Sequence, residues 1–155
     1  MSVHVTTKKI IKEWTDYNEH MNMAYYVLIF DLAWEVILEK FKMGEHSAKT
    51  SKKSTMVVET HTTYNNEVKQ GDEVDIVLTY FDHDKKRLHF KLEMYEKTKK
   101  TLSATIEMLS LYIDLGKRKV AEFEEEKVKI MDEFINKNKS EFVLDNLIFS
   151  GKLKK

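Results

Sequence analysis

The pattern of apolar and polar positions predicts one long helix near the start of the chain. From about residue 22 to residue 42 most side chains are apolar. The polar exceptions Asp31, Glu35 and Glu39 are spaced four apart, which keeps them on one narrow stripe of a helix. A helix that is apolar over most of its circumference must be buried over most of it. Gly44 is predicted to end this helix.

Most of the remaining chain has patterns typical of strands. A first strand is predicted at residues 4–11, and a polar loop over residues 46–54 follows the long helix. Four further strands are predicted at residues 55–64, 74–81, 87–95 and 102–115, separated by short polar turns. Short turns between alternating strands predict an antiparallel meander with one buried face.

The order of these elements predicts an α+β fold in which the sheet curls around the long helix, because both have apolar surface to bury. Apolar residues at Val128, Met131, Phe134 and Ile135 predict a second, amphipathic helix over residues 122–138, lying on the outside. The last twelve residues fit either an added strand or a flexible end. We therefore expect a main domain over residues 1–120 and a helical extension over residues 121–155.

Composition narrows the possible partners and the location. Lys and Arg together number 26, as do Asp and Glu, so a formal net charge of +0 gives no reason to expect nucleic acid or a membrane as partner. The chain has no cysteine, which excludes disulfides and thiolate chemistry. The N-terminus lacks the apolar run of a signal peptide. A bilayer span needs about 20 apolar residues, and no apolar run in this sequence is that long. We expect a cytoplasmic protein.

Polar chemistry is concentrated where the long helix begins. Residues 16–22 read D-Y-N-E-H-M-N, which places two carboxylates, two amides and an imidazole at the start of the most apolar element. Such residues are common at helix starts, where they bond to local backbone groups. The same residues also suit a reaction site, because the first turn of a helix has unpaired N–H groups and partial positive charge.

The residues around this cluster resemble a known family. The run W-T-D-Y-N-E-H-M-N-M-A-Y-Y resembles the opening motif of hotdog-fold acyl-CoA thioesterases of the 4-hydroxybenzoyl-CoA thioesterase type, roughly Asp-x-x-Gly-His-x-Asn-x-x-x-Tyr. The stretch V-V-E-T-H-T-T-Y-N-N-E-V-K-Q-G-D-E-V resembles the second strand and the Gly-Asp step of that family. In wording the motifs are most similar to betainyl-CoA-type members. The resemblance covers about residues 3–120 and implies a sheet of about five strands around one helix.

The resemblance implies the catalytic residues. Asp16 falls at the catalytic aspartate position and would act either as nucleophile on the thioester or as general base on water. The backbone N–H of Met23 is the candidate oxyanion donor. His20 and Asn22 match the family positions. His20 also fits a structural role in the first turn, and Asn22 fits a cap or a pocket-ordering residue better than a role in bond making.

A second set of residues is assigned to substrate binding: Glu19, Tyr25, Glu59, His61 and Arg87. Glu19 replaces the glycine of the motif, so it brings a side chain and a charge to the expected substrate site. Glu59 and His61 share one face of a strand and either order a water and recognise the acyl head, or form an exposed charge pair. Arg87 and residues 117–119 are weaker candidates for the phosphates of coenzyme A (CoA). No metal-ligand spacing is present, so we predict no metal site.

These residues predict a thioester hydrolase acting on a short or medium acyl-CoA. CoA is part of the substrate, so no separate cofactor is expected. An exposed edge strand predicts a homodimer or a homotetramer, and the resemblance implies an active site between subunits. Glu59 and His61 of one subunit could then act on the Asp16 region of its neighbour. The alternatives are a non-catalytic acyl-CoA-binding protein and a hydratase or dehydratase on the same fold.

Overall fold

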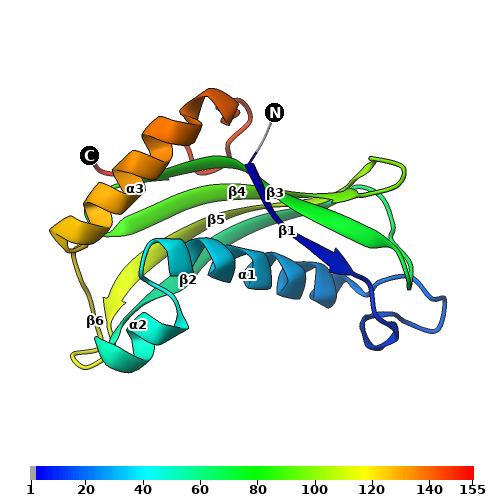
Figure 1. Cartoon of the computed structure of the whole chain (residues 1–155), viewed down its shortest axis with the longest axis horizontal. Helices are drawn as coiled ribbons and strands as arrows, with labels where there is room; N and C mark the ends of the chain where they lie inside the picture. Colours follow the sequence, from blue (N-terminus) through cyan, green and yellow to red (C-terminus); the bar gives the residue numbers. More distant parts are fainter. Residues whose placement is uncertain (1–2) are drawn as a thin grey trace.

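The computed structural model describes residues 3–155 and contains one curled antiparallel sheet (Figure 1). Its strands are β1 (Val3–Lys9), β2 (Lys53–Tyr64), β3 (Glu73–His83), β4 (Arg87–Glu96), β5 (Leu102–Asp114) and β6 (Lys119–Val120). The strand order is β1-β3-β4-β5-β2, with the two-residue β6 added beside β5. The five main strands that the alternation predicts are therefore present. The short β6 has too few residues to give a recognisable pattern.

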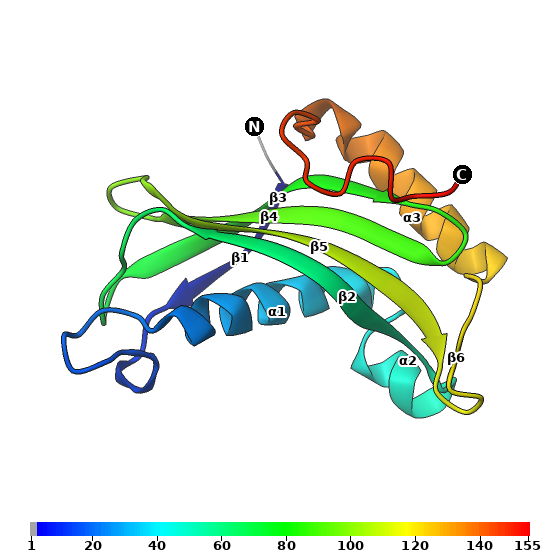
Figure 2. The same cartoon turned by 180° about the vertical axis from the view of Figure 1, so that it is seen from behind.

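The helix α1 (Met23–Lys40) lies along the concave face of the sheet (Figures 1 and 2). Its buried face includes Ile29, Phe30 and Trp34, which pack against the inward residues of the strands. The ring of Trp34 stacks on Phe90 of β4 with centroids 3.4 Å apart. A curled sheet around one long apolar helix is the hotdog architecture, so the predicted fold is confirmed.

The helix ends earlier than predicted, and glycine is not the residue that ends it. Lys42 adopts the left-handed conformation, with φ 61°, directly after the last turn. Gly44 instead precedes a short helix, α2 (Glu45–Thr50), inside the segment predicted as a loop. The carboxylates of Glu35 and Glu39 lie close to the position that a Cβ at Gly44 would take. Both the predicted stop at Gly44 and the uninterrupted loop are wrong.

The helix α3 (Glu125–Asn138) lies at the periphery but contributes to the same core as α1. Met131 is fully buried. Phe134 packs edge-on against Phe41 and Phe81, with ring centroids 5.3 and 6.0 Å away. After α3 and the short 3₁₀ helix η2 (Lys139–Glu141), the chain runs along the part of β3 that β1 does not cover, where the Val143 N–H donates to the Thr79 carbonyl at 2.8 Å. The C-terminal segment therefore closes one edge of the sheet.

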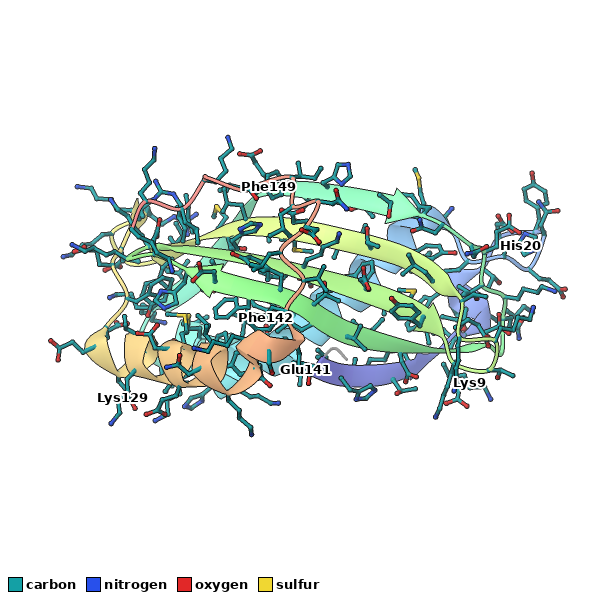
Figure 3. All side chains as sticks on the ribbon, turned by 90° about the horizontal axis from the view of Figure 1, so that it is seen from above. Lys9, His20, Lys129, Glu141, Phe142 and Phe149 are labelled. Atoms are coloured by element: carbon teal, nitrogen blue, oxygen red, sulfur yellow. The ribbon has the colours of Figure 1, made fainter. Side chains whose placement is uncertain are left out.

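The last residues cross the outer face of the sheet (Figure 3). Between residues 142 and 155 they form no strand, and specific hydrogen bonds hold them in place. The Glu107 carboxylate accepts the N–H groups of Ile148 and Phe149, each at 2.8 Å. Asp84 accepts the N–H of Lys154 at 2.8 Å. The tail is thus neither an added strand nor a free end.

Part of α1 and most of one sheet edge are exposed. The strand β2 pairs with β5 on one side, and no strand of residues 3–155 pairs with its other side. On this strand Met56, Val57 and Val58 are between 43% and 50% exposed. The solvent side of α1 carries a row of exposed apolar residues, Met23, Val27, Leu28, Leu32 and Val36. No helix in the described chain is long and apolar enough to cross a membrane.

Candidate active site

The residues between the 3₁₀ helix η1 (Lys12–Trp14) and α1 form a tight loop, residues 15–22, which we call the helix-start loop. The N–H of Asp16 donates to the His20 carbonyl at 3.0 Å, and Thr15 and Met21 form a β-bridge. Met21 is buried, and its N–H donates to the Val68 carbonyl at 2.9 Å. The loop is therefore fixed by backbone bonds on both sides, while the side chains of residues 16–19 are exposed.

Asp16 presents an exposed carboxylate in this loop. One oxygen, Oδ1, accepts the backbone N–H of Asn18 at 2.8 Å. That is its single side-chain hydrogen bond among residues 3–155, so most of its capacity to accept hydrogen bonds remains available. The bond to Asn18 orients the carboxylate without neutralising it, which suits a base or nucleophile.

The start of α1 provides the electrophilic half of the site. The Asn22 side chain caps the helix by accepting the Ala24 N–H at 3.0 Å, and the Asn22 N–H donates to the Trp14 carbonyl at 3.0 Å. The N–H of Met23, the first helical residue, has no acceptor within the helix. It can donate to a substrate carbonyl oxygen, and the helix dipole adds partial positive charge at the same place.

His20 links the helix-start loop to the loop between β2 and β3. Its Nδ1 lies 3.3 Å from the carboxylate of Glu67, and its backbone forms a β-bridge with Lys69. The side chain is 35% exposed, so one edge of the ring faces solvent. This contact holds the two loops together, which corresponds to the structural alternative that the sequence left open.

Glu19 adopts the left-handed conformation, with φ 66°. This conformation favours glycine, which the motif has at this position. The Glu19 carbonyl accepts the Gln70 N–H at 3.2 Å, which holds the unusual backbone in place. Its side chain lines a cavity of about 690 Å³ together with Lys9, Lys12 and Lys69.

Aromatic side chains surround the first turn of α1. Tyr25 stacks on Trp14 with ring centroids 6.3 Å apart. Tyr26 is buried, accepts the Val68 N–H on its hydroxyl at 3.3 Å and meets Tyr64 edge-on at 5.3 Å. Burial raises the pKa of Tyr26, with the nearby Glu67 adding to the effect and the Val68 bond opposing it. We did not single out Trp14, Tyr26 or Tyr64 from the sequence, although Tyr26, four residues after Asn22, fits the tyrosine of the motif.

The structure does not bring Glu59 and His61 to Asp16 within one chain. Both lie on the outer face of the sheet, in register with Leu109 and Glu107 of β5. Glu59 lies 3.7 Å from the ammonium group of Lys152 in the tail.

His61 lines a separate cavity on that outer face, about 270 Å³ in volume, beside the tail. Asp16 belongs to the loop at the start of α1, and α1 packs against the opposite face of the sheet. Any joint action with Asp16 therefore has to involve another chain.

Arg87 lies at the end of the sheet opposite the helix-start loop. The ring contact between Tyr26 and Tyr64 places the start of α1 at the end of β2. Strand β4 runs in the same direction as β2, since each pairs antiparallel with β5, so Arg87 at its start is far from Tyr64. The guanidinium group pairs with Asp84 at 2.9 Å, and residues 117–119 follow β5 at this same distant end. None of these cations reaches Asp16 in one chain.

Comparisons with known proteins identify a family and several relatives. The family described as the thioesterase-like superfamily matches residues 11–135. A betainyl-CoA thioesterase of Pseudomonas aeruginosa is 30% identical over 128 residues, which are 81% of this chain and 80% of that protein. The family match over residues 11–135 includes the helix-start loop and α1.

Solved structures show the same fold. A hypothetical protein of Staphylococcus aureus, solved in complex with CoA, superposes with a TM-score of 0.82 at 24% identity, covering 89% of this chain and 87% of that one. A putative thioesterase of Pseudomonas putida superposes with a TM-score of 0.82 at 23% identity, covering 100% of this chain and 99% of that one. At these identities the likeness concerns the arrangement of the helix and sheet.

Proposed function

The chain belongs to the thioesterase-like superfamily, and we propose that it hydrolyses the thioester bond of a short or medium acyl-CoA. The observation that carries this proposal is the pairing of two groups at the start of α1. Asp16 has an exposed carboxylate with spare accepting capacity, and the Met23 N–H has no acceptor within the helix. A thioester needs both kinds of group, one to attack or activate water and one to stabilise the oxyanion.

In this mechanism the thioester carbonyl oxygen accepts the Met23 N–H, and the helix dipole stabilises the negative charge that forms on it. Asp16 either attacks the carbonyl carbon, giving an anhydride that water then cleaves, or removes a proton from an attacking water. The C–S bond breaks, and the CoA thiolate leaves and takes up a proton. Asn22 holds the first turn of the helix, and His20 holds the helix-start loop against its neighbour.

We propose a homodimer as the working form. The row of exposed apolar residues on α1 and the unpaired edge of β2 occupy one continuous side of the molecule, and a second copy pairing along β2 would cover both. Antiparallel pairing of two β2 strands would place the start of one strand beside the end of the other, close to the partner's helix start. A site completed in this way excludes water from the acyl group.

We propose that the acyl group is small and that acyl groups with a cationic head are one class of substrate. Support comes from the relative named betainyl-CoA thioesterase and from the aromatic pair of Trp14 and Tyr25 beside the helix start. Aromatic faces attract quaternary ammonium groups. Glu19 and Glu59, the two carboxylates assigned to substrate binding, lie far apart in one chain, Glu19 in the helix-start loop and Glu59 on the outer face of the sheet. The aromatic pair is therefore the better basis for this preference.

The test is thiol release from a panel of acyl-CoA substrates by the wild type and by Asp16→Asn. The panel pairs betainyl-CoA with its neutral isostere 3,3-dimethylbutyryl-CoA, so that charge is separated from shape. We expect hydrolysis by the wild type and a loss of about 10³-fold in Asp16→Asn, in the range for a positioned acid or base. Full activity in the variant would show that Asp16 is not the reacting carboxylate.

Two further outcomes identify the other functions. Binding of acyl-CoA without thiol release from any substrate would identify a non-catalytic acyl-CoA-binding protein. Addition of water to an enoyl-CoA with the thioester left intact would identify a hydratase. Equal rates with betainyl-CoA and its neutral isostere would exclude a preference for cationic acyl groups.

A further inference from the structure

A cavity of about 690 Å³ lies beside the helix-start loop, at the end of the molecule where Figure 3 labels Lys9 and His20. Its walls come from three segments that are separate in sequence: the end of β1 and the residues after it, the helix-start loop, and the loop before β3. Its size is typical of small-molecule sites. We call it the lysine cavity, after Lys9, Lys12 and Lys69 in its lining.

The charge of the lysine cavity is positive. Lys9, Lys12 and Lys69 are exposed, and none of their ammonium groups has an ion-pair partner in the described part of the chain. The one acidic side chain in the lining is Glu19. Three lysines without ion-pair partners around one concave surface attract anions, and lysine binds phosphate as a point charge.

The walls of the cavity are held in fixed positions by backbone hydrogen bonds. The Ile10 N–H donates to the Asp72 carbonyl, and the Gly71 N–H donates to the Ile10 carbonyl, each at 2.8 Å. Gly71 has φ 90°, and the space around the position of a Cβ is open. Its backbone therefore leaves the cavity wide at this point. Ile11, which is 43% exposed, adds an apolar patch against which a flat ring can pack.

The cavity is also close to the reacting groups. Glu19 belongs both to its wall and to the loop that carries Asp16. Met23 is four positions after Glu19, and even a fully extended chain of four residues spans at most about 14 Å. The pantetheine arm of CoA is an extended chain that joins the thioester to the phosphates over a comparable length. A thioester at the Met23 N–H therefore leaves the phosphates within reach of the cavity.

We propose that the lysine cavity binds the phosphate-bearing adenosine end of the CoA substrate. The ammonium groups contact the phosphates, and the adenine ring packs on Ile11. The proposal rests on the proposed function and gives it a second anchor, distant from the bond that breaks. Within one chain the cavity lies nearer the reacting groups than Arg87 and residues 117–119, which lie at the other end of the sheet.

The test compares three thioesters with the same acyl group: acyl-CoA, acyl-dephospho-CoA, which lacks the 3′-phosphate, and acyl-N-acetylcysteamine, which lacks every phosphate. The double variant Lys12→Gln/Lys69→Gln removes two charges from the cavity. The control Lys99→Gln/Lys137→Gln removes two exposed charges elsewhere. Thermal unfolding of all proteins shows that each is folded before kinetics are measured.

We expect the cavity variant to raise KM for acyl-CoA by about tenfold, which two solvent-accessible charge contacts can supply. Its kcat should stay close to the wild-type value, and its hydrolysis of acyl-N-acetylcysteamine should not change. Acyl-dephospho-CoA should show an intermediate effect. In the wild type the advantage of acyl-CoA over the truncated thioester should fall as salt rises, because exposed charges are screened.

Adenosine 3′,5′-bisphosphate is the direct probe of the cavity. It should inhibit the wild type competitively with acyl-CoA and inhibit the cavity variant about tenfold more weakly, as expected for two lost charge contacts. Equal inhibition by inorganic phosphate at the same concentration would reduce the cavity to a simple anion site and overturn the proposal. An unchanged KM for acyl-CoA in the cavity variant would do the same. Failure of the wild type to hydrolyse any thioester would instead overturn the proposed function.

Discussion

Two carboxylates in this chain lie in contrasting surroundings. Asp16 is exposed in the helix-start loop and accepts one hydrogen bond, from Asn18. Glu107 is 1% exposed on the outer face of the sheet and accepts three, from Ile148, Phe149 and the ring of His89, at 2.8, 2.8 and 2.7 Å. We call Glu107 and these three hydrogen-bond donors the tail clip.

The difference is one of hydrogen-bond saturation. Burial raises the pKa of the Glu107 carboxyl, but the bonds from Ile148, Phe149 and His89 outweigh it and hold that pKa below its ordinary value. A buried anion that already accepts three hydrogen bonds stabilises a structure and has little capacity left to bind a substrate. A carboxylate with unused acceptors at a helix start can take part in chemistry. Saturation distinguishes the two roles better than residue type does.

The largest expected effect is the loss of activity without loss of stability in Asp16→Asn. The amide oxygen of asparagine can still accept the Asn18 N–H, so the loop should keep its geometry. We expect kcat to fall by about 10³-fold and the free energy of unfolding to change by less than about 0.5 kcal/mol. Thiol-release kinetics and urea unfolding on the same samples measure both quantities.

The control for this variant is Asp145→Asn, which makes the same chemical change on an exposed residue of the tail. It should alter neither quantity. A large loss of stability in Asp16→Asn would mean that Asp16 is a structural residue like Glu107, and the contrast between the two regions would not hold.

The reverse result is expected at the tail clip. Glu107→Gln removes the negative charge and one of the oxygens that accept hydrogen bonds from Ile148, Phe149 and His89, and leaving a buried donor without its acceptor typically costs about 1–3 kcal/mol. The free energy of unfolding from urea titration measures the cost, while kcat per folded molecule should stay unchanged. A loss of kcat as large as that in Asp16→Asn would place Glu107 in the reaction instead.

The elements that could be predicted from sequence are those in which one periodic signal outweighs the others. The α1 pattern and the strand alternation required burial on a particular side, and the structure satisfies both. The end of α1 was mispredicted because Lys42 takes the left-handed conformation usually left to glycine. The path of the tail could not be predicted either, since it depends on single hydrogen bonds to Glu107 and Asp84 rather than on a repeating pattern.

The candidate site divides in the same way. The residues contiguous in sequence, from Asp16 to Met23, share one loop and one helix start, so their proximity could be predicted. The distance of Arg87 from the helix-start loop depends on the end of the sheet at which its strand begins. The distance of Glu59 and His61 from that loop depends on the face of the sheet that they occupy. Composition and spacing do not determine the face once a β-bulge, here between Val57 and Glu59, shifts the alternation.

A smaller effect is expected from acid. The folded-state pKa of Glu107 is lowered, so its contribution to stability is present above the ordinary carboxyl pKa of 4.5 and is lost as the pH falls through the folded value. Urea unfolding between pH 7 and pH 3 should therefore show a steeper loss in the wild type than in Glu107→Gln. Identical slopes would mean that the tail clip does not titrate.

The smallest effect is expected at Glu19, where the helix-start loop keeps a side chain in a conformation that suits glycine. The left-handed conformation destabilises a residue with a Cβ by about 1–2 kcal/mol. A glycine gives the unfolded chain more conformational entropy, which lowers the free energy of unfolding by about 0.4–1 kcal/mol. Glu19→Gly should therefore stabilise the fold by up to about 1 kcal/mol, measured by urea unfolding. Asn18→Gly, one residue earlier and without a positive φ, should destabilise it. If both variants destabilise, the Glu19 carboxylate contributes more to the loop than its backbone strain removes, and the lysine cavity would be the place to look for its partner.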